Sequence, residues 1–112
     1  MTPKLVLVDG RNVQRSRWPN VSDEELVRRC RAWATEHETE AEVVFDGRAP
    51  EDAIGTGRES ADDWIARRAT ELHVAGTPYW LVTSDRELRR RAGEHAERTI
   101  GGGGFLRELG LG

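Results

Sequence analysis

Four aspartates occupy positions from which they could act together on a ligand. Asp9 ends the run LVLVD, Asp46 follows VVF and Asp85 follows LVTS, while Asp62 lies in the segment SADD at the start of a helical pattern. A carboxylate at the edge of a core is costly unless it is paired, hydrogen-bonded or bound to a cation. Two carboxylates about 5 Å apart repel by about 3 kcal/mol at an effective dielectric constant near 20. Because a hard divalent cation reverses that repulsion, a cluster of these acids predicts a Mg²⁺ or Mn²⁺ site.

Such a metal would generate hydroxide from bound water and neutralise charge on a phosphoryl group. Arginines surround the acids in predicted loops and helix starts: Arg11, Arg15, Arg17, Arg48, Arg58 and Arg86. Arginines around a cluster of acids suit the binding of a nucleic-acid strand, because the arginines can bind its phosphates while one phosphodiester bond reaches the acids. We expect Arg11, Arg48 and Arg86 to contact phosphates, although for any single arginine solvation at the surface is the more common explanation.

Each acid also has a structural explanation. Asp9 and Asp46 each precede a glycine, and Asp-Gly favours turns. Asp62 and Asp85 fall in first helical turns, where a carboxylate gains from the helix dipole. Asp63 is expected to serve Ser60 as the acid of a capping box.

Three other polar or aromatic residues belong to the same region of the predicted fold. Asn12 and Ser84 are expected to orient carboxylates and waters around the metal. Trp18, in the first loop, allows two interpretations, which are stacking on a nucleic-acid base and packing against the first long helix.

Other chemistries fit less well. His37, His73 and His95 fall near predicted helix ends, away from the acids, which argues against histidine acid–base cleavage. No Ser or Cys occupies a nucleophile elbow, and Cys30 is expected to be a packed thiol in a helical pattern. The tetraglycine 101–104 lacks the Lys-Ser/Thr of a phosphate loop and is expected to be a flexible turn.

The elements that must position these residues alternate along the chain. Short apolar runs predict strands at 4–8, 42–45, 79–83 and 98–100, and helical patterns open at Ser22, Ser60 and Ser84, with a short last helix at 105–109. Continuous apolar runs suit a mainly parallel sheet covered by helices on both faces, a three-layer Rossmann-like α/β fold. The carboxyl ends of parallel strands meet at one edge, which brings Asp9, Asp46 and Asp85 together. Asp62 reaches that edge because it extends the apolar face of its helix.

Composition sets the broad class. The chain has 112 residues, 37% of them hydrophobic, and a net charge of −3, which suits one small globular domain. No apolar run approaches the roughly 20 residues of a membrane span, and the first residues lack a signal-peptide pattern. A single cysteine excludes an internal disulfide, so a cytoplasmic location is expected.

The segments DGRN, VVFDG, ESADDWI and VTSD, in this order, resemble those of NYN domains in the PIN-like nuclease superfamily, particularly the YacP-like branch. The resemblance extends from about residue 5 to residue 109. It implies a Rossmann-like fold and a Mg²⁺- or Mn²⁺-activated water that acts on RNA. The matching residues are Asp9, Asn12, Asp46, Asp62, Thr83, Ser84 and Asp85.

Together these observations predict one NYN/PIN-like nuclease domain over residues 1–112 that hydrolyses RNA phosphodiester bonds, with endonuclease activity favoured. Asp9, Asp62 and Asp85 are expected to hold the metal directly or through water. Asp46 is expected to complete the acidic pocket or position the attacking water. RNA is the expected partner, with ribosome association as an option and no membrane. Two alternatives stay open: an RNA- or ribosome-associated binding module with little activity, and a metal-dependent phosphatase for small phosphoesters.

Overall fold

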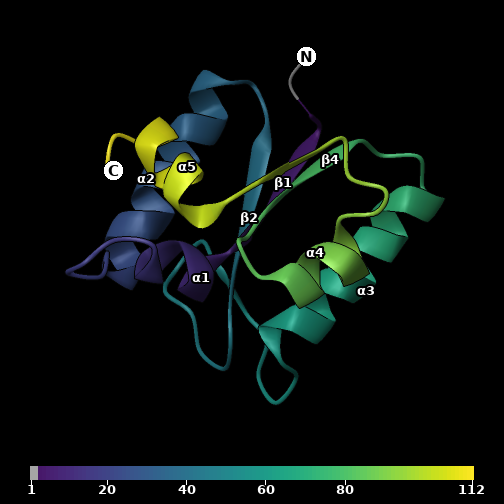
Figure 1. The fold of residues 1–112 in the computed structure, drawn as a ribbon, viewed down its shortest axis with the longest axis horizontal. Coiled ribbons are helices and arrows are strands. Elements are labelled where there is room, and N and C mark those ends of the chain that lie inside the picture. Colours follow the sequence, from purple (N-terminus) through teal and green to yellow (C-terminus); the bar gives the residue numbers. More distant parts are fainter. Residues whose placement is uncertain (1–2) are drawn as a thin grey trace.

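Strands and helices alternate along residues 3–112, the part of the chain that the computed structural model describes (Figure 1). In chain order the elements are β1 (Leu5–Asp9), α1 (Gly10–Arg15), α2 (Asp23–Glu36), β2 (Glu40–Phe45), β3 (Ile54–Gly55), α3 (Ala61–Val74), β4 (Tyr79–Val82), α4 (Arg86–Ala92), β5 (Arg98–Ile100) and α5 (Gly102–Glu108). The predicted strands and helices are all present. Two elements, α1 and β3, lie where no helix or strand is predicted.

All five strands are parallel, in the order β3-β2-β1-β4-β5. The central strand β1 is buried along its whole length, as its apolar sequence requires. The chain crosses from β1 to β2 on one side and later to β4 on the other, so the strand order reverses at β1. Ligands of open α/β sheets bind at such a reversal, outside the carboxyl ends of the strands.

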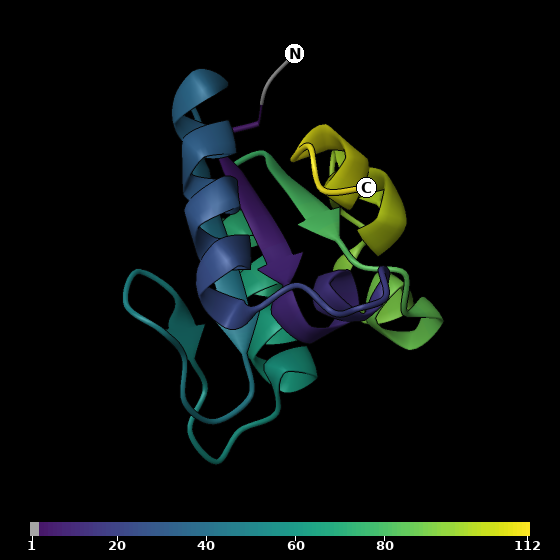
Figure 2. The same ribbon diagram turned by 90° about the vertical axis from the view of Figure 1, so that its left-hand side faces the viewer.

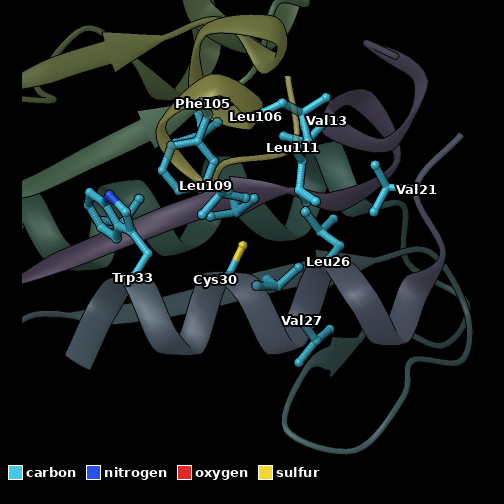
Figure 3. Close-up of a cluster of buried hydrophobic side chains, with 14 of the residues drawn as sticks. Val13, Val21, Leu26, Val27, Cys30, Trp33, Phe105, Leu106, Leu109 and Leu111 are labelled. Carbon is cyan, nitrogen blue, oxygen red and sulfur yellow. The ribbon is translucent and has the colours of Figure 1, made fainter. Parts of the chain in front are cut away.

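Helices cover both faces of the sheet, which confirms the predicted three-layer α/β fold (Figure 1). Alternate residues of β1 face the two layers: Val6 and Val8 pack in a cluster with α1, α2 and α5, and Leu5 and Leu7 pack in a second cluster with α3 and α4. Figure 3 shows the first cluster, in which Cys30 is fully buried. Burial raises the pKa of this thiol to about 12, so Cys30 is the packed thiol that the helical pattern predicts.

The tetraglycine is not a flexible turn, and that prediction is wrong. Gly102, Gly103 and Gly104 form the first turn of α5. Gly102 is buried against α1, where an added Cβ would lie 3.0 Å from Oδ1 of Asn12 and would collide with the Ser16 hydroxyl. The absence of a side chain at Gly102 therefore lets α5 pack directly against α1.

The segment DGRN forms a helix start rather than a turn alone. Gly10 is the first residue of α1, and a Cβ there would lie 2.7 Å from the Phe45 ring and 2.9 Å from the Val44 carbonyl oxygen. This close approach holds α1 at the carboxyl end of the sheet. Figure 2 shows the segment that contains β3 extending past the same end. Within residues 3–112, no helix is long and apolar enough to cross a membrane.

Candidate active site

Asp9 ends the central strand in a nearly closed environment, since only 6% of the residue is exposed. The Thr83 hydroxyl, just after β4, donates a 2.9 Å hydrogen bond to Oδ2 of Asp9. The backbone N–H of Asn12 lies near the same carboxylate and lowers its pKa. These contacts fix the carboxylate at the strand reversal and join the DGRN and TSD segments.

Asn12 and Ser84 continue this connection. Oδ1 of Asn12 accepts a 2.8 Å hydrogen bond from the backbone N–H of Ser84, and the Ser84 hydroxyl accepts a 2.9 Å bond from the N–H of Gly102. Three segments that are distant in the sequence, α1, the β4–α4 loop and the start of α5, are thereby fixed to one another beside Asp9. Both residues lie where the sequence predicts, and their action on metal-bound waters stays a prediction.

Asp85 lies in the same loop but has a structural task of its own. Its Oδ1 accepts a 2.8 Å hydrogen bond from the N–H of Leu88, which makes it the N-cap of α4. Its own N–H donates to the Thr83 hydroxyl at 3.2 Å. The helix that was expected to open at Ser84 therefore begins one residue later. The residue is exposed, and its second carboxylate oxygen makes no hydrogen bond within residues 3–112.

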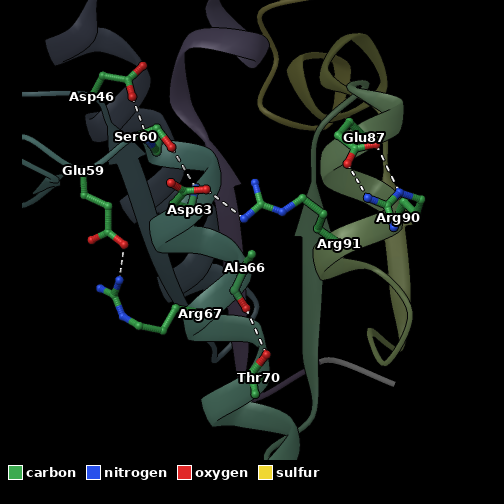
Figure 4. Close-up of polar contacts among 11 residues, drawn as sticks. Asp46, Glu59, Ser60, Asp63, Ala66, Arg67, Thr70, Glu87, Arg90 and Arg91 are labelled. Carbon is green, nitrogen blue, oxygen red and sulfur yellow. Dashed lines mark hydrogen bonds and ion pairs between the residues drawn. The ribbon is translucent and has the colours of Figure 1, made fainter.

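Asp46 approaches from the end of β2 and is also tied to a helix start. Its Oδ1 accepts a 2.6 Å hydrogen bond from the N–H of Ala61, the first residue of α3 (Figure 4). The Ser60 hydroxyl caps the same helix by accepting from the N–H of Asp63 at 3.0 Å. The serine half of the predicted capping box is therefore present. The Asp63 carboxylate also reaches across to α4, where it pairs with Arg91 at 2.8 Å.

Asp62 differs from the other three acids, whose carboxylates each accept a hydrogen bond. The side chain is half-buried at the start of α3, and no hydrogen bond to its carboxylate is found within the described residues. The helical face predicted from the sequence is present, because Ile65, Ala69 and Leu72 are buried in the layer beneath it.

The four acids act on one another electrostatically. Burial raises the pKa of Asp9, the Thr83 hydroxyl lowers it, and the charges of Asp62 and Asp85 raise it again. Burial likewise raises the pKa of Asp62, followed by the charges of Asp85 and Asp46, with Arg91 opposing them. Mutual repulsion of this kind means that the acids converge on one edge of the sheet, as the topology predicts.

The four acids converge on one edge of the sheet, but they do not form a complete coordination shell for a metal ion. Among residues 3–112, no three His, Cys, Asp or Glu side chains lie close enough together to hold a metal ion as they are oriented. The chemistry of the donors nevertheless fits a hard divalent ion. Their oxygens carry negative charge, and none of the four acids forms an ion pair within residues 3–112. Mg²⁺ also keeps several waters, so it does not require contact with every acid.

The arginines divide into paired and unpaired sets. Arg11 belongs to the paired set: it forms a 2.8 Å ion pair with Asp23, donates to Gln14 at 2.9 Å and lies over the Phe45 ring. These contacts hold α1 against α2. Within residues 3–112, the arginines without an acidic partner are Arg15, Arg17, Arg48, Arg58, Arg86, Arg89, Arg98 and Arg107. Arg48 and Arg86 are exposed at the carboxyl edge, where the sequence predicts them.

Analysis of single residues in the sequence does not identify two residues that shape this site. Thr83 is fully buried and positions Asp9, and its only sequence signal is its place in the TSD motif directly after a strand. Arg91 counters the charge of Asp62 from a neighbouring helix, a contact between α3 and α4 that no local pattern reveals. Arg89 adds to the same region, since its Nε donates to the Thr83 carbonyl oxygen at 2.9 Å.

These features define a three-layer α/β domain in which Asp9, Asp46, Asp62 and Asp85 form an acidic edge at the strand reversal. Solved structures share that fold. The crystal structure of a mutant of Rae1 (YacP) from Bacillus subtilis superposes with a TM-score of 0.77 at 22% identity, covering 96% of this chain and 75% of that one. A second crystal structure of Rae1 (YacP) from the same organism gives 0.71 at 24% identity, with 95% and 73% covered. No family model and no curated protein sequence matches the chain. The chain thus has the YacP-like fold that its motifs predict.

Proposed function

We propose that this chain is a metal-dependent ribonuclease that hydrolyses phosphodiester bonds at the acidic edge. The observation that carries the proposal is the electrostatic coupling of Asp9, Asp62, Asp85 and Asp46 around the carboxyl end of the central strand. The charges of Asp62 and Asp85 raise the pKa of Asp9, and those of Asp85 and Asp46 raise the pKa of Asp62. Such repulsion destabilises the folded chain, and a divalent ion would reverse that effect.

Asp9, Asp62 and Asp85 would hold a Mg²⁺ or Mn²⁺ ion, directly or through water. When bound, the ion would supply an activated water and neutralise charge that develops on the phosphoryl group. The chain's own groups prepare the site: Thr83 fixes the Asp9 carboxylate, and the Asn12–Ser84 hydrogen bond fixes the loop that carries Asp85. Asp46, at the end of β2, would complete the negative pocket or position the attacking water.

The substrate assignment depends on the unpaired arginines and on the family resemblance. Exposed Arg48 and Arg86 would bind phosphates on either side of the scissile bond, because guanidinium groups make bidentate contacts with phosphate. Arg11 is committed to Asp23, so we assign it a structural role first. RNA, cut internally, is the substrate that the resemblance to YacP-like domains favours, and ribosome association follows only from the same resemblance.

A second candidate function is an RNA-binding module with negligible turnover. The observation that favours it is the lack of three ligating side chains in a ready arrangement within residues 3–112. In that case the acidic edge would bind RNA through its arginines without hydrolysing it.

Single-turnover cleavage of labelled RNA with Mn²⁺ separates the two functions. We expect Asp9→Asn to reduce the rate by at least about 100-fold, since even outer partners of a metal site change activity by about 10–100-fold. Asp63→Asn is the matched control, because Asp63 is an aspartate one residue from Asp62 whose carboxylate pairs with Arg91. Equal cleavage by wild type and Asp9→Asn would eliminate the proposed mechanism.

A further inference from the structure

The loop between α1 and α2 presents an indole to solvent. Trp18 is 86% exposed, whereas Trp33 is 5% exposed and lies in the core. The interpretation that Trp18 packs against the first long helix therefore does not hold. Among residues 3–112, the only other large hydrophobic residue with a similarly exposed side chain is Val74, at the far end of α3, which is 80% exposed.

This loop is anchored on both sides of the indole. The Arg17 Nη1 donates to the Leu111 carbonyl oxygen at 3.0 Å, and the Ser16 hydroxyl donates to the Asn12 carbonyl oxygen at 2.8 Å. On the other side, Val21 is buried and its carbonyl oxygen accepts a 3.0 Å bond from Gln14. A fixed loop loses little conformational entropy when its exposed side chain binds a ligand.

The loop also begins a short distance from the acidic edge. The helix α1 leaves Asp9 directly, and its six residues advance only about 9 Å before the loop begins. At the end of α1, Ser16 lies against Gly102, whose N–H bonds to Ser84 beside Asp9. In Figure 1 the loop that follows α1 lies on the side of the site away from α3 and α4.

Charge identifies the kind of partner. From Arg15 to Ser22 the loop carries two arginines and no acid, in a chain whose net charge is −3. Arg15 is exposed and has no acidic partner within residues 3–112. An exposed aromatic ring next to cationic side chains is the arrangement by which proteins hold single-stranded nucleic acid, with a base on the ring and phosphates on the cations.

We propose that Trp18 stacks on an unpaired base of the RNA strand that crosses the acidic edge, with Arg15 binding a flanking phosphate. This inference rests on the proposed function, since it takes the substrate to be RNA. It adds a preference for single-stranded RNA, because a base in a duplex is not available to stack on the indole.

The test measures binding separately from cleavage. Fluorescence anisotropy of labelled single-stranded RNA and of blunt-ended duplex RNA is recorded with the full chain carrying Asp9→Asn, without divalent metal. We expect Trp18→Ala to weaken single-stranded binding by about 5- to 150-fold, the range for one stacked base. Trp18→Phe, which keeps a stacking ring, should lose much less, and duplex binding should change little.

Val74→Ala is the matched control and should bind as the parent does, because Val74 is equally open but lies at the far end of α3. Unchanged single-stranded binding by Trp18→Ala would overturn the proposal, as would an equal loss on the duplex. Displacement of the RNA by an acidic peptide, with equal loss of peptide binding in Trp18→Ala, would assign the loop to a protein partner instead and would also overturn it. If Trp18→Ala weakens binding while no variant cleaves RNA, this proposal stands and hydrolysis fails.

Discussion

The hydroxyl of Thr83 donates a 2.9 Å hydrogen bond to the carboxylate of Asp9, joining the ends of the two neighbouring strands β4 and β1. Burial raises the pKa of Asp9, this bond lowers it, and the charges of Asp62 and Asp85 raise it again. Thr83 thus helps to keep a buried carboxylate ionised at the strand reversal. The acidic edge is prepared by hydrogen bonds from the chain before any ion is considered.

Thr83→Val removes this hydroxyl while keeping the shape of the side chain. Two buried or partly buried groups, the Asp9 carboxylate and the Asp85 N–H, lose a partner. The free energy of unfolding should therefore fall by about 1–3 kcal/mol at neutral pH. Urea unfolding measures the change, and Thr83→Ser should restore most of it because it returns the hydroxyl. A Thr83→Val protein as stable as wild type would show that the bond contributes nothing.

Asp62→Asn should stabilise the metal-free chain at neutral pH. The pKa of Asp62 is raised above its ordinary value of 3.8 in the folded chain, so ionisation costs stability as pH rises through the folded pKa. Removing the charge should raise the free energy of unfolding by no more than about 1 kcal/mol, because solvent screens a half-exposed group. The gain should be present at pH 7 and vanish below pH 3.8, where the wild-type carboxyl is protonated in both states.

Thermal melts across that pH range, with and without Mn²⁺, provide the measurement. Wild type should gain more from Mn²⁺ than Asp62→Asn does, since an ion that binds the folded state stabilises it. If the variant melts lower than wild type without metal and responds equally to Mn²⁺, Asp62 has a structural role instead.

Asp85→Ala and Asp85→Asn separate helix capping from metal binding. The Asp85 carboxylate caps α4 through the Leu88 N–H, so alanine should cost about 1 kcal/mol of stability. Asparagine is an equally good cap and should retain that stability. Both variants should cleave RNA poorly if the charge is needed for a metal. Full activity in the stable Asp85→Asn variant would restrict this residue to capping.

Two adjacent glycines of α5 should respond in opposite directions to alanine. Gly102→Ala places a Cβ against Asn12 and Ser16 and should cost about 1–3 kcal/mol through overpacking. Gly103→Ala meets only the flexible end of Arg107, at 4.0 Å, and should stabilise the helix by about 0.5–1 kcal/mol. Denaturant unfolding of both variants provides the comparison, and an equal effect would argue that α5 does not pack against α1 as described.

The sequence predicts four of the five strands and the two long helices because their signals are local. Apolar runs mark β1, β2 and β4, and Ser22 and Ser60 cap α2 and α3 as expected. Parallel topology then brings Asp9, Asp46 and Asp85 to one edge without any knowledge of their contacts.

The elements that the sequence does not predict depend on contacts between distant segments. Glycine is a poor helix former, yet Gly10 and Gly102 both lie in helices. These helices pack so closely against neighbouring elements that a Cβ at either position would collide with them. The commitment of Arg11 to Asp23 likewise follows from how α1 meets α2, and no spacing rule contains it.

Anomalous diffraction from crystals soaked in Mn²⁺ tests the central claim most directly, because it locates the ion itself. We predict an anomalous peak beside the Asp9 carboxylate, facing Asp62 and Asp85, and its loss in crystals of Asp9→Asn. No peak at this edge, at a Mn²⁺ concentration that supports RNA cleavage in solution, would contradict the account.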